Sequence, residues 1–233
     1  SLRRALLLKA ADALEAKTPA FIEAVSAETG ATGMWGGFNV MLAAGMIREA
    51  AALTTQVAGE VIPSDVPGSL AMGIRQPAGV VLGIAPWNAP IILAVRAICV
   101  PLACGNTVIL KGSENCPRTH QLIIEAFQDA GFPPGVVNYI TNAPADAGAV
   151  VEAMVAHPAV RRVNFTGSTK VGKIIAATCA KYLKPVVLEL GGKAPLVVLD
   201  DANLDDAVNG AAFGAFANSG QICMSTERII VDN

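Results

Sequence analysis

The chain's most regular segment begins Val80-Val81-Leu82-Gly83-Ile84 and, after a helical pattern at residues 91–103, continues into a second apolar run, Thr107-Val108-Ile109-Leu110. Short runs rich in Val, Ile and Leu are typical of strands that are buried on both faces of a parallel sheet. Two parallel strands need a crossover between them, and the helix at 91–103 supplies one. The segment therefore predicts a strand–helix–strand unit of an α/β fold.

The same alternation extends to both sides of this unit. Because helices that alternate with buried strands cover both faces of a parallel sheet, we expect a Rossmann-like open parallel sheet with helices on both faces. Ligands of such sheets bind beyond the carboxyl ends of the strands. The expected strands are 80–84, 107–110, 136–140, 162–165 and 186–190. The expected helices include 3–29, with a break at Pro19, 39–57, 91–103 and 118–130.

Residues 59–78 interrupt this order with a different pattern. Two extended stretches, 61–63 and 69–75, flank a turn signal at Asp65-Val66-Pro67-Gly68, which predicts a β-hairpin. Two strands alone are marginally stable in water, so we expect the hairpin to extend a sheet of another subunit. A homodimer or a homotetramer is therefore expected.

Composition excludes several classes of function. The 233 residues are 53% hydrophobic and 15% charged with a formal net charge of -2, and their scattered Lys and Arg argue against a nucleic-acid surface. The longest apolar region, 78–110, is broken by prolines, asparagines and an arginine, so we expect no membrane span. No signal peptide precedes the first helical pattern, and we expect a cytoplasmic protein.

The five cysteines form an odd set without C-x-x-C spacing, and both histidines lie far from any cysteine pair. This pattern predicts neither a disulfide framework nor a zinc site, and we expect no bound metal. It leaves room for one reactive thiol among cysteines that otherwise serve as small hydrophobes. The candidate is Cys223, in the segment Gly220-Gln221-Ile222-Cys223-Met224-Ser225.

An isolated carboxylate, Glu189, stands upstream in the apolar segment Leu188-Glu189-Leu190-Gly191-Gly192-Lys193. Cysteine is the strongest neutral-pH nucleophile in proteins, and a desolvated carboxylate is a candidate general base. Together with Cys223, Glu189 predicts an enzyme that forms a thioester and then activates water. Each residue alone has a plainer explanation, because most free cysteines are buried and inert and a strand carboxylate can point to solvent.

A second charged pair follows the strand 107–110, with Lys111 directly after it and Glu114 three residues later. At a strand end, a lysine can reach a phosphate or a ribose hydroxyl, and a carboxylate can accept hydrogen bonds from both ribose hydroxyls. The alternative is an ordinary solvated loop pair.

A glycine-containing turn, Gly167-Ser168-Thr169-Lys170-Val171-Gly172, follows the strand that ends at Phe165 and opens a helix. Glycines permit close approach of a ligand to the backbone, and a helix N-terminus favours an anionic phosphate. The turn is not a full G-x-G-x-x-G fingerprint, so, taken alone, it is better explained as an ordinary Ser/Thr helix cap.

The loop Pro86-Trp87-Asn88 lies just past the strand 80–84. An asparagine amide in a rigid loop can donate a hydrogen bond to a developing alkoxide, which makes Asn88 a candidate oxyanion donor. A turn in which the proline and the asparagine are purely structural is the alternative.

These motifs occur in one order, P-W-N, K-x-x-E, F-T-G-S, E-L-G-G-K and G-Q-I-C, and with them the chain closely resembles the NAD(P)-dependent aldehyde dehydrogenase superfamily. The resemblance runs through essentially the whole sequence, and its last two motifs are highly specific. Segments 85–90, 159–169 and 221–228 resemble the branch that oxidises aromatic aldehydes such as salicylaldehyde, benzaldehyde and vanillin. Salicylaldehyde is our first choice of substrate within it.

The resemblance implies a role for each candidate residue. Cys223 matches the nucleophile, Asn88 and the backbone N–H of Cys223 match the oxyanion site, and Glu189 matches the base that activates the hydrolytic water. The presence of Glu189 favours release of the free acid over transfer to coenzyme A. The implied cofactor-binding residues are Lys111 and Glu114 at the ribose, Gly167 and Ser168 beside the pyrophosphate, and Trp87 at a wall of the cleft.

The resemblance also implies the division into domains. Residues 1–58 and 79–190 match the NAD-binding domain, 59–78 the oligomerisation hairpin, and 191–233 the truncated start of a second α/β domain, the catalytic one. Family members continue well past the nucleophile, so we expect an N-terminal fragment that does not oxidise aldehydes by itself.

The implied cofactor is NAD, with NADP as the alternative, because Glu114 would repel the 2′-phosphate of NADP. The implied substrate is a small aldehyde. Two rival functions remain at this point: a cysteine-dependent esterase or thioesterase, and a non-catalytic nucleotide-binding module with the same fold.

Overall fold

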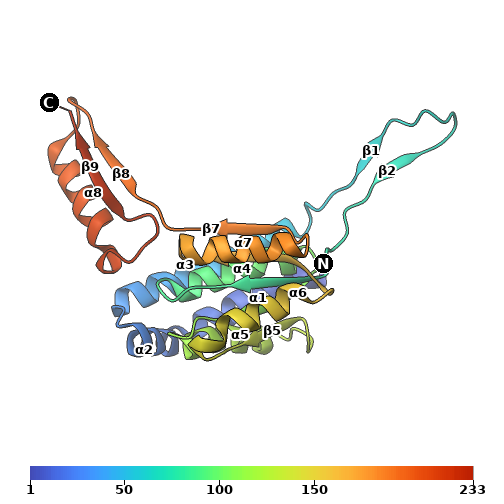
Figure 1. The fold of residues 1–233 in the computed structure, drawn as a ribbon, viewed down its shortest axis with the longest axis horizontal. Coiled ribbons are helices and arrows are strands. Elements are labelled where there is room, and N and C mark those ends of the chain that lie inside the picture. The colour runs from blue at the N-terminus through green and yellow to red at the C-terminus, as the bar shows by residue number, and fades with distance from the viewer. Residues whose placement is uncertain (233) are drawn as a thin grey trace.

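The computed structural model describes residues 1–232, and its centre is a five-stranded sheet in the order β5-β4-β3-β6-β7 (Figure 1). Each neighbouring pair of strands in this sheet is parallel, as the sequence predicts. Asn233, the last residue of the expected catalytic domain, lies outside the described residues. The strands are β3 (Val80–Ile84), β4 (Thr107–Lys111), β5 (Val137–Ile140), β6 (Val160–Thr166) and β7 (Val186–Glu189).

Helices pack on both faces of the sheet, which confirms the Rossmann-like expectation. Side chains alternate along each strand, so Val81 packs into one core and Leu82 into the other. The first core is built with α1 (Leu2–Ala16), α2 (Thr18–Thr29), α3 (Gly33–Leu53), α4 (Pro90–Ala103) and α5 (Pro117–Asp129). The second core is built with α6 (Ala147–Ala156) and α7 (Thr169–Lys181).

Helix α3 begins at Gly33 instead of the expected Asn39. The Thr32 hydroxyl accepts a hydrogen bond from a backbone N–H of the first turn and so caps the helix. A Cβ at Gly36 would lie 3.0 Å from a methyl carbon of Val25 on α2, so this glycine lets the two helices approach closely. Glycine also has a low helix propensity, which explains why the sequence pattern missed the first turns of α3.

A carboxylate from α2 caps the N-terminus of α5. Glu28 accepts hydrogen bonds from the backbone N–H of Arg118 (2.7 Å) and from the backbone N–H (2.9 Å) and hydroxyl (2.6 Å) of Thr119. An anionic acceptor is favourable at a helix N-terminus because the first backbone N–H groups have no partner within the helix. The contact therefore links α2 to α5, the helix that follows the loop after Lys111.

We expect Glu28→Ala to lower the free energy of unfolding by about 2 kcal/mol, because it removes a cap that is also a charge-assisted acceptor. Urea titration at neutral pH measures this difference. Glu23→Ala is the matched control, since it removes an exposed carboxylate from the same helix and should change the free energy by less than about 0.5 kcal/mol. Equal effects of the two substitutions would show that the Glu28 contacts do not stabilise the fold.

Residues 59–78 form the predicted hairpin, and it projects away from the sheet (Figure 1). Its strands, β1 (Glu60–Ile62) and β2 (Ala71–Gly73), pair antiparallel. The hairpin carries apolar side chains that are not packed in a core: Val61 is 74% exposed, Leu70 70% and Ile74 71%.

The C-terminal residues form a small βαβ unit at the other end of the molecule (Figure 1). It contains β8 (Ala194–Val198), α8 (Leu204–Phe216), the 3-10 turn η2 (Ala217–Gly220) and β9 (Thr226–Val231), and β8 pairs parallel with β9. A second 3-10 turn, η1 (Pro144–Asp146), precedes α6 in the main body. Phe213 and Phe216 on α8 are each 77% exposed, so this unit presents an uncovered apolar face.

Within residues 1–232, no helix combines the length and the apolar character needed to cross a bilayer. The same part of the chain contains no group of three or more His, Cys, Asp or Glu side chains that could hold a metal ion.

Candidate active site

A cleft of about 400 Å³ lies beyond the carboxyl ends of β3, β6 and β7. The loop after β3, the turn after β6 and the loop before β9 line it. The carboxyl edge of a parallel sheet is where such loops converge from distant parts of a sequence. The cleft contains all three expected catalytic residues and three of the expected cofactor-binding residues: Trp87, Asn88, Gly167, Ser168, Glu189 and Cys223.

Cys223 is half-buried and follows a sharply turned backbone. Asn218, Ser219 and Gly220 have φ values of 48°, 57° and 73°, in the left-handed region that side chains disfavour. The Ser225 hydroxyl donates a hydrogen bond to the Gly220 carbonyl (3.2 Å) and closes the loop. The glycine and the serine of the motif thus shape the loop that places Cys223 at the cleft.

Asn88 is hydrogen-bonded to the same loop. Its side-chain Nδ2 donates to the Gln221 carbonyl (2.8 Å), and its backbone carbonyl accepts from Asn218 Nδ2 (3.0 Å) and from Trp35 Nε1 (2.9 Å). An amide nitrogen carries two hydrogens, so one remains for another acceptor in the cleft. The contacts bring the candidate oxyanion donor and the loop of Cys223 together.

Glu189 ends β7, and its side chain is exposed, which corrects our expectation of a desolvated carboxylate. The reason lies in the position of the strand. β7 is an edge strand whose Leu188 face packs in the core with α7, whereas the face that carries Glu189 and the 64%-exposed Val187 is open. The alternation of side chains therefore places Glu189 in the cleft and in contact with water.

Lys111 and Glu114 do not line this cleft but lie at the carboxyl end of the neighbouring strand β4. Lys111 is only 5% exposed, so the reading of a solvated loop pair is wrong for it. Its Nζ donates to Glu114 Oε1 (2.5 Å), and Asn142 Nδ2 donates to the same oxygen (2.9 Å). Burial favours the neutral form of Glu114, but these hydrogen bonds outweigh it and lower the pKa of its carboxyl.

Sequence reasoning missed Asn142, which follows β5. A signal was available, because polar residues at the carboxyl ends of parallel strands gather at one edge.

The turn at Gly167 and Ser168 has a structural explanation within the chain. The Ser168 hydroxyl accepts a hydrogen bond from the Val171 N–H (3.3 Å) and caps α7. A Cβ at Gly167 would lie 2.5 Å from the ring of Phe165. The helix-cap alternative is therefore confirmed, and both residues also line the cleft.

His120 anchors the loop between Lys111 and Glu114. It lies on α5, is fully buried, and its Nδ1 accepts a hydrogen bond from the Ser113 N–H (3.1 Å). Burial lowers the pKa of His120 to about 4, because the charged imidazolium would be desolvated. A protonated Nδ1 would also place a hydrogen against the Ser113 N–H.

We expect the burial of neutral His120 to make stability depend on pH. Its folded-state pKa of about 4 lies below the ordinary value of 6.5, so the contribution is fully present above pH 6.5 and declines as the pH falls towards 4. Within that window, the free energy of unfolding should fall by up to about 1.4 kcal/mol per pH unit.

Urea titrations at several pH values test this dependence. His120→Gln should flatten the slope, whereas His157→Gln, at an exposed helix end, should keep it. If the free energy of unfolding of His120→Gln depends on pH as steeply as that of wild type, other groups cause the dependence.

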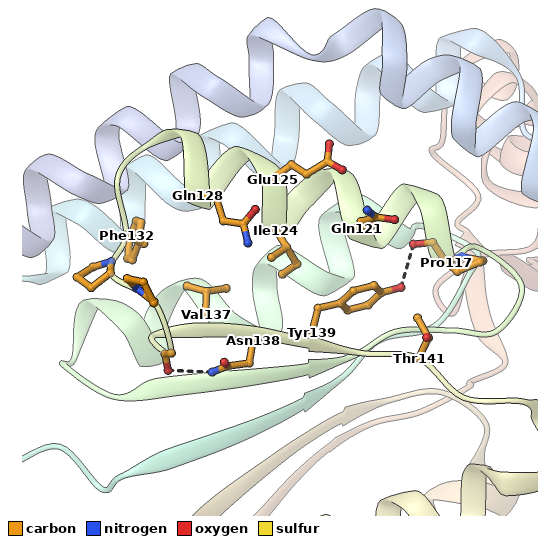
Figure 2. Close-up of a pocket in the computed structure, with 13 residues that line it drawn as sticks. Pro117, Gln121, Ile124, Glu125, Gln128, Phe132, Val137, Asn138, Tyr139 and Thr141 are labelled. Carbon is orange, nitrogen blue, oxygen red and sulfur yellow. Dashed lines mark hydrogen bonds between the residues drawn. The ribbon is translucent and has the colours of Figure 1, made fainter.

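A larger cavity, of about 940 Å³, lies between α5 and the edge strand β5 (Figure 2). Tyr139 crosses it, and its hydroxyl donates to the Pro117 carbonyl (2.9 Å). None of the candidate catalytic or cofactor-binding residues lines this cavity. Size alone therefore does not identify the site, and the smaller cleft at Cys223 is the one that gathers reactive groups.

The chain is similar in sequence and in fold to known enzymes. The profile of the aldehyde dehydrogenase family matches residues 1–233. A vanillin dehydrogenase from Pseudomonas fluorescens is 68% identical over 230 residues, which make up 99% of this chain and 48% of the relative. A salicylaldehyde dehydrogenase from Pseudomonas putida is 55% identical over 230 residues, with 99% and 48% covered. A solved salicylaldehyde dehydrogenase from Pseudomonas putida G7, complexed with salicylaldehyde, has a TM-score of 0.97 at 54% identity, covering 100% of this chain and 48% of that one.

The chain thus spans about half the length of the curated relatives it matches. Among its solved neighbours are enzymes described as NAD-dependent and as NADP-dependent. A profile that matches the whole sequence, together with this level of identity, shows that the chain belongs to the aldehyde dehydrogenase family.

Proposed function

We propose that this chain supplies the cofactor-binding and nucleophile-bearing part of an enzyme that oxidises an aromatic aldehyde to the carboxylic acid with NAD. The single observation that carries the proposal is the shared cleft of Cys223, Asn88 and Glu189. It combines a nucleophile, an amide donor and a carboxylate in contact with water. Those are the groups that a thioester route needs.

In this proposal, the Cys223 thiolate adds to the aldehyde carbonyl carbon and forms a thiohemiacetal. The remaining N–H of Asn88 Nδ2 stabilises the negative charge on the former carbonyl oxygen. NAD, when bound, supplies the acceptor for the hydride that leaves the carbon. Glu189 then takes a proton from water, whose hydroxide attacks the thioester, releases the acid and restores the thiol. The exposure of Glu189 supports this last role, because the base must reach water.

The residues at the strand ends fit a nicotinamide dinucleotide. Glu114 is a carboxylate at the end of β4, and both of its side-chain hydrogen-bond donors use Oε1, so Oε2 can accept from a ribose hydroxyl. The buried Lys111 adds a positive charge beside it. Gly167 and Ser168 would hold the pyrophosphate at the start of α7, and Trp87 would form a wall of the cleft. The carboxylate of Glu114 favours NAD over NADP.

For the substrate, we propose an aromatic aldehyde with vanillin ahead of salicylaldehyde. The sequence alone suggested salicylaldehyde, but the chain is 68% identical to a vanillin dehydrogenase and 55% identical to a salicylaldehyde dehydrogenase. Pairing of the apolar hairpin with a second subunit, to give a homodimer or a homotetramer, is part of the same proposal and can be measured by light scattering.

Reduction of NAD and NADP by the full-length gene product tests the function, with vanillin, salicylaldehyde, benzaldehyde and acetaldehyde as substrates. We expect NAD reduction with the aromatic aldehydes and little with acetaldehyde. Ester cleavage that is unaffected by NAD, without any aldehyde oxidation, would favour the hydrolase instead. Cofactor binding with no chemistry would favour the binding module.

We expect Asn88→Ala to lower turnover by roughly 10²–10³-fold, because one oxyanion donor is lost. Steady-state kinetics of the full-length protein measure this effect. Asn88 also contacts the loop of Cys223, so the rate of Cys223 alkylation by iodoacetamide serves as the control for loop position. Undiminished turnover in a variant with a wild-type alkylation rate would remove Asn88 from the mechanism.

A further inference from the structure

Asn142, the second residue after β5, has one buried side-chain atom without a partner among the described residues. Its Nδ2 donates to Glu114 Oε1 (2.9 Å) and to the Ala143 carbonyl (2.8 Å). Its Oδ1 is buried and has no hydrogen-bond partner in the part of the chain that the structure describes. Rotating the amide by half a turn would place Oδ1 against two other acceptors, so the nitrogen must face Glu114.

A buried oxygen without a partner lowers stability, because it has lost its hydrogen bonds to water. An apolar side chain at position 142 would remove that cost. The amide is therefore poorly explained by stability alone, and its effect must be sought in the group that it holds. Unsatisfied buried polar atoms are few in folded proteins, and each one calls for an explanation.

The group that Asn142 holds is the carboxylate of Glu114. Lys111 from the end of β4 and Asn142 from the end of β5 both donate to Oε1, so donors from two neighbouring strands fix one oxygen. A carboxylate with two such donors cannot swing away without breaking both bonds. Its second oxygen, Oε2, has no side-chain donor among the described residues and keeps a defined direction.

We propose that Asn142 is a positioning residue that holds Glu114 in place and thereby makes the cofactor site selective for NAD. The proposal rests on the proposed function. A fixed carboxylate accepts hydrogen bonds from ribose hydroxyls and repels a 2′-phosphate, whereas a mobile one can turn away and admit it. Selectivity thus depends on the hydrogen bond from Asn142 as well as on the charge of Glu114.

Dissociation constants of the full-length protein for NAD and for NADP, measured by calorimetry without aldehyde, test this proposal. We expect wild type to bind NAD more tightly than NADP. Asn142→Ala should reduce the ratio of the dissociation constant for NADP to that for NAD about tenfold, which is the effect of one hydrogen bond to a charged group. The melting temperature should change little, because removal of the unpartnered oxygen offsets the loss of the two hydrogen bonds that Nδ2 donates. Asn142→Ser, which is too short to reach Glu114, should give the same result and provides a second variant.

The effect should act through Glu114. In a Glu114→Ala background, adding Asn142→Ala should leave the ratio unchanged, because no carboxylate remains to be positioned. If Asn142→Ala lowers the ratio of dissociation constants as much in the Glu114→Ala background as in wild type, the proposal is overturned.

Asn138 offers the matched control. It lies on β5 (Figure 2), and its Nδ2 also donates twice, to the carbonyls of Val108 (3.1 Å) and Gly135 (2.9 Å), but not to Glu114. Asn138→Ala should lower stability and leave the ratio of dissociation constants at the wild-type value. An unchanged ratio in Asn142→Ala, or an equal drop in Asn138→Ala, would overturn the positioning role. Wild type that binds neither nucleotide would instead refute the proposed function.

Discussion

Replacing Cys223 by alanine in the full-length protein is expected to reduce aldehyde oxidation by roughly 10⁴-fold or more, because the proposed covalent route depends on the Cys223 thiol. Cys99 and Cys116 are buried, and burial raises the pKa of each thiol to about 12. Burial also raises the pKa of Cys179. None of these thiols lines the cleft, so none can replace Cys223.

Cys104→Ala is the matched control for this experiment. Cys104 is also half-buried and free, but it lies at the end of α4 and not in the cleft. Its removal should leave turnover close to wild type, and Cys223→Ala should still bind NAD. Substantial oxidation by Cys223→Ala would contradict the covalent route.

Glu189→Gln is expected to separate the two halves of the reaction. In the proposed route, formation of the thioester does not need the base, so one equivalent of NAD should be reduced rapidly at each site. Hydrolysis should then be slower by roughly 10²–10⁴-fold, the usual contribution of a general base. Stopped-flow absorbance would show a burst followed by a slow steady state.

A second carboxylate in the cleft provides the control for charge. Glu227 lines the same cleft but forms an ion pair with Lys193. Glu227→Gln should show no burst and a turnover close to wild type. If Glu189→Gln also turns over at the wild-type rate, another group activates the water.

The sheet could be predicted because its strands are short, apolar and separated by helices. The expected strand 80–84 is observed with the same bounds, and the run at 107–110 extends by one residue to Lys111. The hairpin was equally clear, since a Pro-Gly turn between extended stretches is a local signal. The start of α3 was not predictable, because its glycines serve contacts with α2 that no pattern within α3 reveals.

The candidate site residues could be chosen by type from the sequence, but their surroundings could not be predicted. Burial of Lys111 and exposure of Glu189 depend on which strand lies at the edge of the sheet, and the order of strands is a tertiary property. Asn142 lies 28 residues from Glu114 in sequence, so only the pairing of β4 with β5 brings the two together. Local sequence carries the chemistry of these groups, whereas topology sets their contacts.

Peptide mass mapping would show directly whether Cys223 carries an oxidised substrate. Full-length Glu189→Gln protein is mixed with vanillin, with and without NAD, and digested after acid quenching. We expect an acyl adduct at the oxidation level of the acid, on the peptide that contains Cys223, and only in the sample with NAD. No adduct on Cys223, or one that forms equally without NAD, would contradict NAD-dependent thioester formation at this residue.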